Sequence, residues 1–151
     1  MSLTIKPIGY IRSPFKKREE APFQGRFSKE LSIIEISEEY EGALKDLELF
    51  NHIIVLYWAN EASFTSFTVK TPHDETPRGL FATRSPNRPN PICLCVVELI
   101  KRRGRQLMVR GLDAIDGSPV IDIKPYIPIF DCHPDANMGW LSGRKMKLTR
   151  R

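Results

Sequence analysis

Every segment of this sequence that is able to bury apolar side chains is short and ends at proline, glycine or a run of polar residues. At least six of these segments alternate in polarity or are rich in β-branched residues, as strands are, whereas one segment has helical spacing. No helix alternates with the strands, so a parallel sheet of βαβ units is excluded. The sequence predicts a mainly β fold, a barrel or folded sheet that is mostly antiparallel and has long loops. The expected strands are 5–13, 31–36, 52–58, 79–84, 92–100, 106–112 and 120–124.

One short helix is expected after the second strand. Ser37 can cap it, and Glu38 and Glu39 place negative charge in its first turn, where the helix dipole favours it. The apolar face of this helix would be Tyr40, Ala43, Leu44 and Leu47. Irregular stretches are expected at 16–27, 62–78, 85–91 and 125–134, and a tight turn is expected at 116–117.

The composition is that of a folded globular chain. Of its 151 residues, 41% are hydrophobic and 27% are charged, which fits a single domain over residues 1–151. The longest apolar run, from Ile53 to Tyr57, is too short to span a bilayer. The first residues show no charged segment followed by an apolar stretch, so no signal peptide is visible. We therefore expect a cytoplasmic protein without a membrane segment.

Positive charge is in excess and is gathered in three clusters. The formal net charge is +5, from 23 Lys and Arg against 18 Asp and Glu. Clusters of this kind attract polyanions such as nucleic acids, although a single cluster is more often a solvated turn or chain end. Three clusters in so short a chain favour a nucleic-acid partner. They are residues 16–18, residues 101–105, and Arg144, Lys145, Lys147, Arg150 and Arg151.

Neither a disulfide framework nor a metal centre is expected. The three cysteines, Cys93, Cys95 and Cys132, are odd in number and have no zinc-ligand spacing, so reduced thiols are the better interpretation. The histidines also form no ligand motif, which makes a metal-dependent hydrolase remote. They are His52, His73 and His133.

A proline-rich loop at 85–91 is the densest concentration of functional residue types. Three prolines fix the backbone of this loop before anything binds. Arg84 and Arg88 flank the first proline and carry planar donor groups suited to phosphate, carboxylate or base edges. The alternative is a rigid surface turn with solvated arginines. Asn87 and Asn90 beside the arginines favour a binding loop.

A second polar concentration spans residues 112–126. Asp122 and Lys124 lie on one face of the expected strand and end near Tyr126, so they are able to line a pocket. A surface ion pair on an amphipathic strand explains the same pattern about as well.

Long blocks of this sequence resemble the TrmO-type tRNA methyltransferases, the TsaA-like family. The blocks are GLFATRSPNRPNPI at 79–92 and DGSPVIDIKPY at 116–126, with IGYIRSP at 8–14, APFQG at 21–25 and FNH at 50–52 in matching order. The resemblance implies a single-sheeted antiparallel β-barrel with one short helix and long loops, usually a homodimer, that binds S-adenosyl-L-methionine. It implies N6-methylation of N6-threonylcarbamoyladenosine at position 37, in the anticodon loop of tRNA.

The resemblance also assigns residues by position. The implied cofactor contacts are Pro22, Phe23, Gln24, Asn60, Glu61, Arg84, Leu94, Ala114, Ile115, Asp116 and Gly117. Asp116 is our candidate for the general base or for a carboxylate beside the sulfonium, although aspartate before glycine is also a common turn former. Arg88, Lys124 and Tyr126 are candidates for holding the modified base, its threonyl carboxylate or nearby phosphates, and Arg88 is placed with Asp116 among the catalytic residues.

Three positions depart from the family pattern. Relatives usually have Gly-Leu-Ser where this chain has residues 93–95, many have histidine in place of Asn60, and arginine is common in place of Phe23. No Gly-x-Gly-x-x-Gly motif is present, so loops must hold the cofactor. Two alternatives remain, a non-enzymatic RNA-binding β-barrel and a methyltransferase with a different acceptor.

Overall fold

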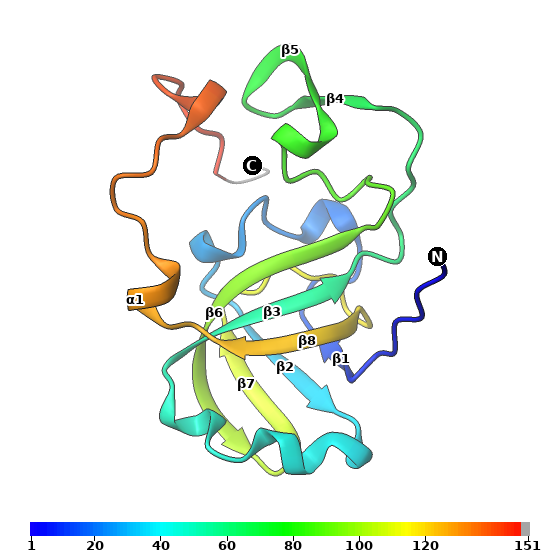
Figure 1. Ribbon diagram of the computed structural model, residues 1–151, viewed down its shortest axis with the longest axis vertical. Coiled ribbons are helices and arrows are strands. Elements are labelled where there is room, and N and C mark those ends of the chain that lie inside the picture. The colour runs from blue at the N-terminus through cyan, green and yellow to red at the C-terminus, as the bar shows by residue number, and fades with distance from the viewer. Residues whose placement is uncertain (149–151) are drawn as a thin grey trace.

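The computed structural model describes residues 1–148 and contains a closed six-stranded barrel beside a small two-stranded sheet (Figure 1). Around the barrel the strand order is β1-β2-β7-β6-β3-β8, and every neighbouring pair is antiparallel. Pairing of β1 with β8 closes the sheet on itself. The predicted mainly β fold with a closed antiparallel barrel is confirmed. The barrel strands are β1 Gly9–Arg12, β2 Leu31–Ile36, β3 His52–Trp58, β6 Ile92–Arg103, β7 Gln106–Arg110 and β8 Pro119–Pro125.

The barrel interior is a continuous apolar core. Along β1, β2 and β3, buried side chains alternate with more exposed ones, as expected when one face of a strand points inward. Because the inward side chains come from all six strands, their burial stabilises the closed form of the sheet. The residues with no exposed surface include Ile11, Ile34, Ile53, Val55, Leu107, Val109 and Val120.

The helices are short, and most are of the 3₁₀ type. The helix expected after Ser37 exists as a 3₁₀ helix, η3, and Ser37 occupies its N-cap position without a side-chain hydrogen bond. Its expected apolar face is confirmed in part, since Leu44 belongs to the core, and Tyr40 and Leu47 pack against it. The helices are η1 Arg18–Glu20, η2 Gly25–Phe27, η3 Glu38–Leu44, η4 Leu47–Leu49, η5 Leu80–Ala82, α1 Pro128–Asp131 and η6 Gly139–Leu141.

The region between β3 and β6 differs from the sequence prediction. Residues 79–84, expected as a strand, turn through η5, where the N–H and the hydroxyl of Thr83 both donate to the Leu80 carbonyl, over 3.1 and 2.9 Å. The irregular stretch expected at 62–78 contains a hairpin, β4 Thr68–Thr71 and β5 Asp74–Gly79. The hydrogen bonds of Thr83 close a turn at η5 in place of the expected strand. The hairpin was predicted to be irregular because the sequence there contains two prolines.

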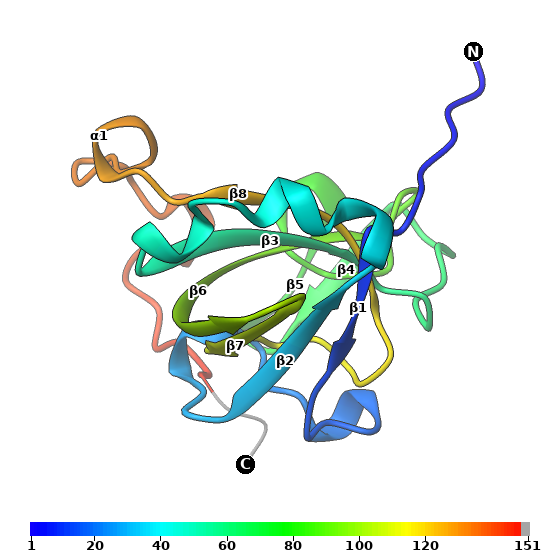
Figure 2. The same ribbon diagram turned by 90° about the horizontal axis from the view of Figure 1, so that it is seen from below.

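Antiparallel order brings three long connections to the same end of the barrel, which we call the mouth. It is formed by the C-terminal ends of β1, β3 and β7 and by the N-terminal ends of β2, β6 and β8, where Trp58 pairs with Ile92 and Leu31 with Arg110. The connections 13–30, 59–91 and 111–118 all leave from the mouth. In Figure 1 the β4–β5 hairpin lies beyond this end, and in Figure 2 η3 and the chain after it run across the other end.

Candidate functional site

The residues predicted to contact the cofactor converge on the mouth. They belong to five segments that are far apart in the sequence, and each segment is a mouth connection or the start of a strand at this end. Within one chain the structure therefore gathers Pro22, Phe23, Gln24, Asn60, Glu61, Arg84, Leu94, Ala114, Ile115, Asp116 and Gly117 at one end of the barrel.

The loop that carries Pro22 to Gln24 is fixed against the barrel by close backbone packing. A Cβ added to Gly25 would meet the Gly111 carbonyl oxygen at 2.1 Å and Cys95 Sγ at 2.7 Å, so only glycine fits here. On its other side the loop meets the proline-rich loop, since Arg84 Nη1 donates to Gln24 Oε1 over 3.3 Å. Two of the predicted cofactor residues are thus in direct contact.

A polar cluster lies beneath this loop, inside the mouth. The Tyr57 hydroxyl donates to Asp113 Oδ1 over 2.7 Å, and Cys95 Sγ donates to the Gly111 carbonyl over 3.2 Å, while the Gly25 backbone acts to lower the pKa of Asp113. Burial raises the pKa of Asp113, which remains half-buried, and burial followed by the Asp113 charge raises the pKa of Tyr57. Burial also raises the pKa values of Cys93 and Cys95, so both remain thiols.

Sequence reasoning assigned no role to this cluster. Tyr57 and Asp113 are 56 residues apart, and their contact depends on barrel closure. One feature of the sequence pointed to a partner for Tyr57. Tyr57 lies at an inward position of β3, whose residues alternate in burial, and a buried hydroxyl needs a hydrogen-bond partner.

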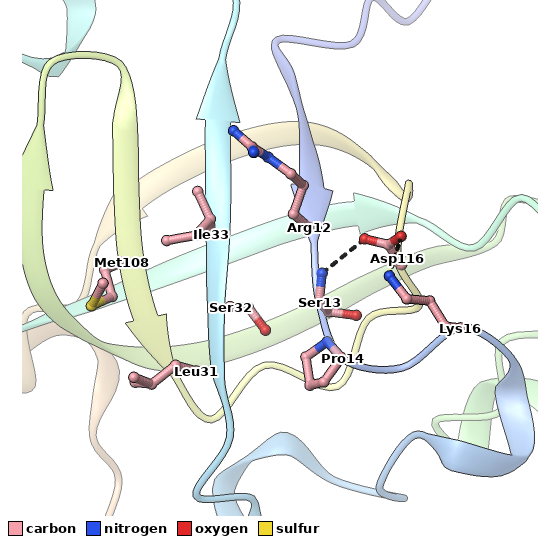
Figure 3. A pocket seen from close by; sticks show the side chains of 9 residues that line it. All are labelled: Arg12, Ser13, Pro14, Lys16, Leu31, Ser32, Ile33, Met108 and Asp116. Atoms are coloured by element: carbon pink, nitrogen blue, oxygen red, sulfur yellow. Dashed lines mark hydrogen bonds and ion pairs between the residues drawn. The ribbon is translucent and has the colours of Figure 1, made fainter.

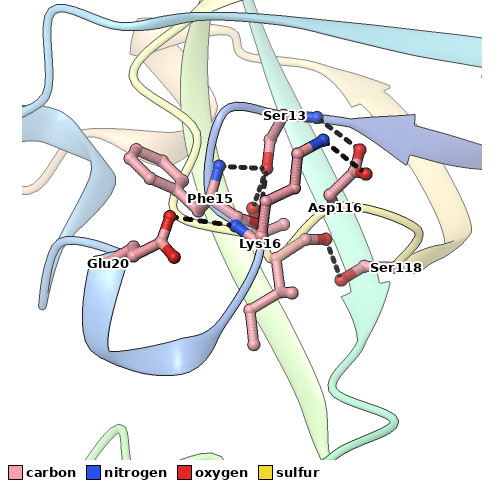
Figure 4. Close-up of polar contacts among 8 residues, drawn as sticks. Ser13, Phe15, Lys16, Glu20, Asp116 and Ser118 are labelled. Carbon is pink, nitrogen blue, oxygen red and sulfur yellow. Dashed lines mark hydrogen bonds and ion pairs between the residues drawn. The ribbon is translucent and has the colours of Figure 1, made fainter.

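Asp116 is held by positive and donor groups from the connection after β1. Figures 3 and 4 show its carboxylate facing the Lys16 ammonium and the Ser13 backbone N–H, at 2.9 and 3.0 Å. These two hydrogen bonds, with the Lys16 one the stronger influence, hold the pKa of Asp116 below its usual range. Asp116 is therefore a charged carboxylate at the edge of a surface pocket of about 460 Å³, lined also by Arg12, Leu31 and Met108.

The turn that contains Asp116 is shaped by its neighbours. Gly117 has φ +86, a backbone conformation that favours glycine, and its N–H donates to the Ile11 carbonyl over 2.7 Å. Ser13 Oγ donates to the Ala114 carbonyl over 2.8 Å, and Ser118 Oγ donates to the Ile115 carbonyl over 2.6 Å. The expected tight turn is confirmed, and it is fixed to the end of β1 (Figure 4).

Arg88 lies inside the proline-rich loop. Its Nη1 donates to the carbonyls of Leu80, Thr83 and Ser85 over 3.1, 2.8 and 3.1 Å. Its guanidinium also lies 5.7 Å from the centre of the Phe81 ring. Arg88 therefore links the loop to η5. Because its Nη1 already binds backbone carbonyls, only the other N–H donors of its guanidinium are left to contact a substrate.

Lys124 and Tyr126 are not brought to the mouth. Lys124 lies near the far end of β8, a strand of seven residues that spans about 20 Å, and Tyr126 follows directly after it. Lys124 Nζ pairs with Asp122 Oδ2 at 2.8 Å on the surface, and the Tyr126 N–H donates to the His52 carbonyl over 3.1 Å. The shared face of Asp122 and Lys124 is confirmed, and it carries a surface ion pair.

The segment after α1 returns over the hairpin and reaches the loop that carries Phe23. Trp140 Nε1 donates to the Ala82 carbonyl over 2.8 Å, and the guanidinium of Arg78 lies 5.0 Å from the centre of the Trp140 ring. Further along, the N–H of Lys147 donates to His73 Nδ1 over 3.0 Å, and the His73 ring packs edge-on against Phe23 with centroids 6.5 Å apart. Residues 139–147 thereby connect the hairpin with the predicted cofactor loop.

The outer face of β3 and β6 is apolar. Leu94 is 52% exposed on this face, next to Ile92 at 39% and Val96 at 37%. Across the strand pair they are opposed by the half-buried Leu56, Trp58 and Ile54. Leu94 therefore points away from the barrel interior, while its neighbours Cys93 and Cys95 point inward.

Residues 1–148 show neither a metal-ligand cluster nor a membrane-spanning helix. No group of three His, Cys, Asp or Glu side chains in this range is arranged to hold a metal ion. No helix in the same range has the length and apolar character needed to cross a bilayer.

The fold and the mouth define a small closed β-barrel protein whose functional loops are gathered at one end. The chain belongs to the tRNA-methyltransferase O family, because residues 10–132 match the model of the tRNA-methyltransferase O N-terminal domain. This match confirms the family resemblance seen in the sequence.

Relatives and solved structures agree with this assignment. A probable S-adenosyl-L-methionine-binding protein of Archaeoglobus fulgidus is 51% identical to this chain over 99% of this chain and 42% of the relative's length. An S-adenosyl-L-methionine-binding protein of the same organism is 53% identical over 86% of this chain and 94% of the relative's length. The Escherichia coli tRNA (adenine(37)-N6)-methyltransferase is 35% identical, over 92% of this chain and 64% of its own. The crystal structure of TrmO from Pseudomonas aeruginosa superimposes with a TM-score of 0.78 at 34% identity, over 93% of this chain and 63% of that one.

Proposed function

We propose that this protein binds S-adenosyl-L-methionine at the mouth and transfers its methyl group to N6 of adenosine 37 in tRNA, with N6-threonylcarbamoyladenosine as the acceptor. The observation that carries the proposal is the convergence of eleven predicted cofactor residues from five distant segments on one end of the barrel. The names of the relatives support the cofactor and the modified base.

The residues at the mouth fit this cofactor, which when bound supplies an electrophilic methyl group on a positively charged sulfur. The half-buried Phe23 ring is suited to stack on an adenine, and Arg84 beside Gln24 is suited to hold a carboxylate. The lowered pKa keeps Asp116 negative, so it is suited to face the positive end of the ligand. These loops would orient the methyl group for in-line displacement, for which positioning supplies much of the acceleration.

The tRNA would approach the mouth. Lys16 to Arg18 follow β1 at this end, and Arg144 to Lys147 lie with the segment that crosses the hairpin, so two of the three basic clusters flank the site. The third, at 101–105, lies at the opposite end, and Arg150 and Arg151 fall outside the described residues. Arg88, Lys124 and Tyr126 remain proposed substrate contacts. Lys124 and Tyr126 would contact the tRNA away from the mouth of their own chain, or would contact tRNA bound at the mouth of a neighbouring subunit.

We further propose that the protein is a cytoplasmic homodimer. The apolar outer face of β3 and β6 is the surface best suited to a second copy, because it is sheet-like and apolar and carries Leu94, a predicted cofactor residue.

Calorimetric titration with S-adenosyl-L-methionine, followed by transfer of labelled methyl to tRNA with or without the threonylcarbamoyl group, tests the proposal. Binding with transfer only to modified tRNA is the expected result. Binding with transfer only to another acceptor would support the second alternative, a methyltransferase of different specificity. Binding of RNA without binding of the cofactor would overturn the proposal in favour of a non-enzymatic RNA-binding barrel.

A further inference from the structure

The polar cluster inside the mouth is not used by any role assigned so far. Its centre is Asp113, a half-buried carboxylate one residue before the predicted cofactor stretch 114–117 and directly below the loop of Gln24. It accepts a hydrogen bond from the Tyr57 hydroxyl at 2.7 Å, and the Gly25 backbone acts to lower its pKa. This carboxylate is therefore partly withdrawn from water at the mouth, next in sequence to the predicted cofactor stretch.

We propose that Asp113, supported by Tyr57, is the general base that removes the N6 proton of the acceptor adenosine. This inference rests on the proposed function. In an N6-acylated adenosine the N6 lone pair is delocalised into the purine and the carbonyl group, so N6 is a poor nucleophile until its proton is withdrawn. As N6 forms its bond to the methyl carbon, the carbon–sulfur bond breaks with its electron pair moving to sulfur, and the N6 proton moves to the Asp113 carboxylate. Solvent takes up that proton after the products leave.

Asp116 is less suited to this role. Its carboxylate is paired with the Lys16 ammonium at 2.9 Å, which lowers its pKa and weakens it as a base. Asp113 has no such ion pair among the described residues, and burial raises its pKa. The pKa of a general base is best placed near the operating pH, and Asp113 is displaced in that direction.

The groups that face Asp113 come from three elements. Tyr57 of β3 and the thiols of Cys93 and Cys95 of β6 lie around it, and the Gly25 N–H approaches from η2. The guanidiniums of Arg18 and Arg88 act on Cys93 from further out. Because the Tyr57 hydrogen bond stabilises the charged carboxylate, Tyr57→Phe should raise the pKa of Asp113 further.

The test is single-turnover methyl transfer as a function of pH, with Asp113→Asn, Tyr57→Phe and the control Asp46→Asn. The asparagine retains an acceptor oxygen for the Tyr57 hydroxyl, so cofactor affinity should stay within about twofold, whereas the rate should fall about 100-fold or more. The wild-type rate should rise through a pKa above the ordinary aspartate value of about 3.9, this limb should vanish in Asp113→Asn, and Tyr57→Phe should move it to higher pH. Asp46 lies in an exposed turn at the opposite end of the barrel, and its variant should match wild type.

A second readout does not depend on turnover. Carboxyl NMR titration of the protein alone should show Asp113 titrating above its ordinary range, and higher still in Tyr57→Phe. A wild type that transfers methyl groups together with an equally active Asp113→Asn would overturn the base assignment and leave the proposed function intact. Loss of cofactor binding in Asp113→Asn, with the rate at saturation retained, would reduce Asp113 to a support for the loop. A wild type without transfer would instead count against the proposed function.

Discussion

The backbones of Gly25 and Gly111 meet where the loop that carries Phe23 joins the barrel, and this contact allows no side chain. In Gly25→Ala the new Cβ would lie 2.1 Å from a backbone oxygen, which cannot move without shifting the loop. We expect a loss of about 1–3 kcal/mol in the free energy of unfolding, measured by denaturant titration, and weaker S-adenosyl-L-methionine binding. Gly42→Ala is the matched control, because a Cβ there meets nothing within 4 Å. Equal behaviour of the two variants would contradict the packing argument.

The Lys16–Asp116 pair predicts a pH dependence of stability. Because the pKa of Asp116 is lowered on folding, the pair stabilises the protein above the unfolded carboxyl pKa of about 3.9, and this contribution disappears as the pH falls through the lower folded value. The carboxylate is 32% exposed, so Asp116→Asn should cost less than about 1 kcal/mol near neutral pH. Denaturation measured from neutral to acid pH should show the gap between wild type and variant closing, and Lys16→Met should reproduce this trend. A gap independent of pH would mean that the ion pair contributes nothing.

At the scale of elements, the segment after α1 stabilises the β4–β5 hairpin from outside. Trp140 contributes one hydrogen bond to Ala82 and one cation–π contact with Arg78. In Trp140→Ala both are lost, so we expect faster amide hydrogen exchange in residues 68–82 and weaker cofactor binding, by a few-fold, through Phe23 and His73. Phe130→Ala removes an aromatic ring that is 73% exposed and should change neither quantity. Unchanged exchange in Trp140→Ala would show that the hairpin stands by itself.

The strands that sequence reasoning predicted well are those whose own residues decide their structure. Residues 31–36 and 52–58 are short segments rich in isoleucine and other apolar residues, as strands are, and both predicted boundaries are confirmed. The hairpin was missed because its strands are largely polar and Pro77 lies within β5, and the structure holds β5 with Trp140 and Arg144 from a distant segment. Such contacts leave no local pattern.

The same distinction applies to the site. Loops that follow antiparallel strands in the right order must meet at one end, so the family resemblance and the strand order together predict the convergence at the mouth. Lys124 was grouped with Arg88 as a substrate contact, and the structure places Lys124 at the end of β8 away from the mouth. The Tyr57–Asp113 hydrogen bond could not be predicted, because it depends on which inward positions of the closed barrel face each other.

At the scale of the whole molecule, the mouth and the side of the barrel present different surfaces, one basic and one apolar, which suit different partners. Basic clusters flank the mouth, where a polyanion would gain from them. The outer face of β3 and β6 is different, since Leu94, Ile92 and Val96 are exposed there without an adjacent basic cluster. An exposed apolar sheet face is costly to leave in water, and a second copy of the chain would cover it.

Val96→Glu tests this face without touching a predicted cofactor residue. Val96 lies opposite Ile54 on the same face as Leu94, so a carboxylate there would be buried unpaired in a dimer but solvated in a monomer. Sedimentation velocity should show a dimer for wild type and a shift of at least tenfold in the dissociation constant for the variant, with unchanged thermal stability of the monomer. Ile129→Glu, at an 86% exposed position on α1, is the control. If cofactor affinity falls together with dimerisation, Leu94 reaches the cofactor of the neighbouring subunit; if affinity is retained, each mouth is complete on its own. A monomeric wild type would remove the dimer from the proposed function and leave this apolar face for another partner.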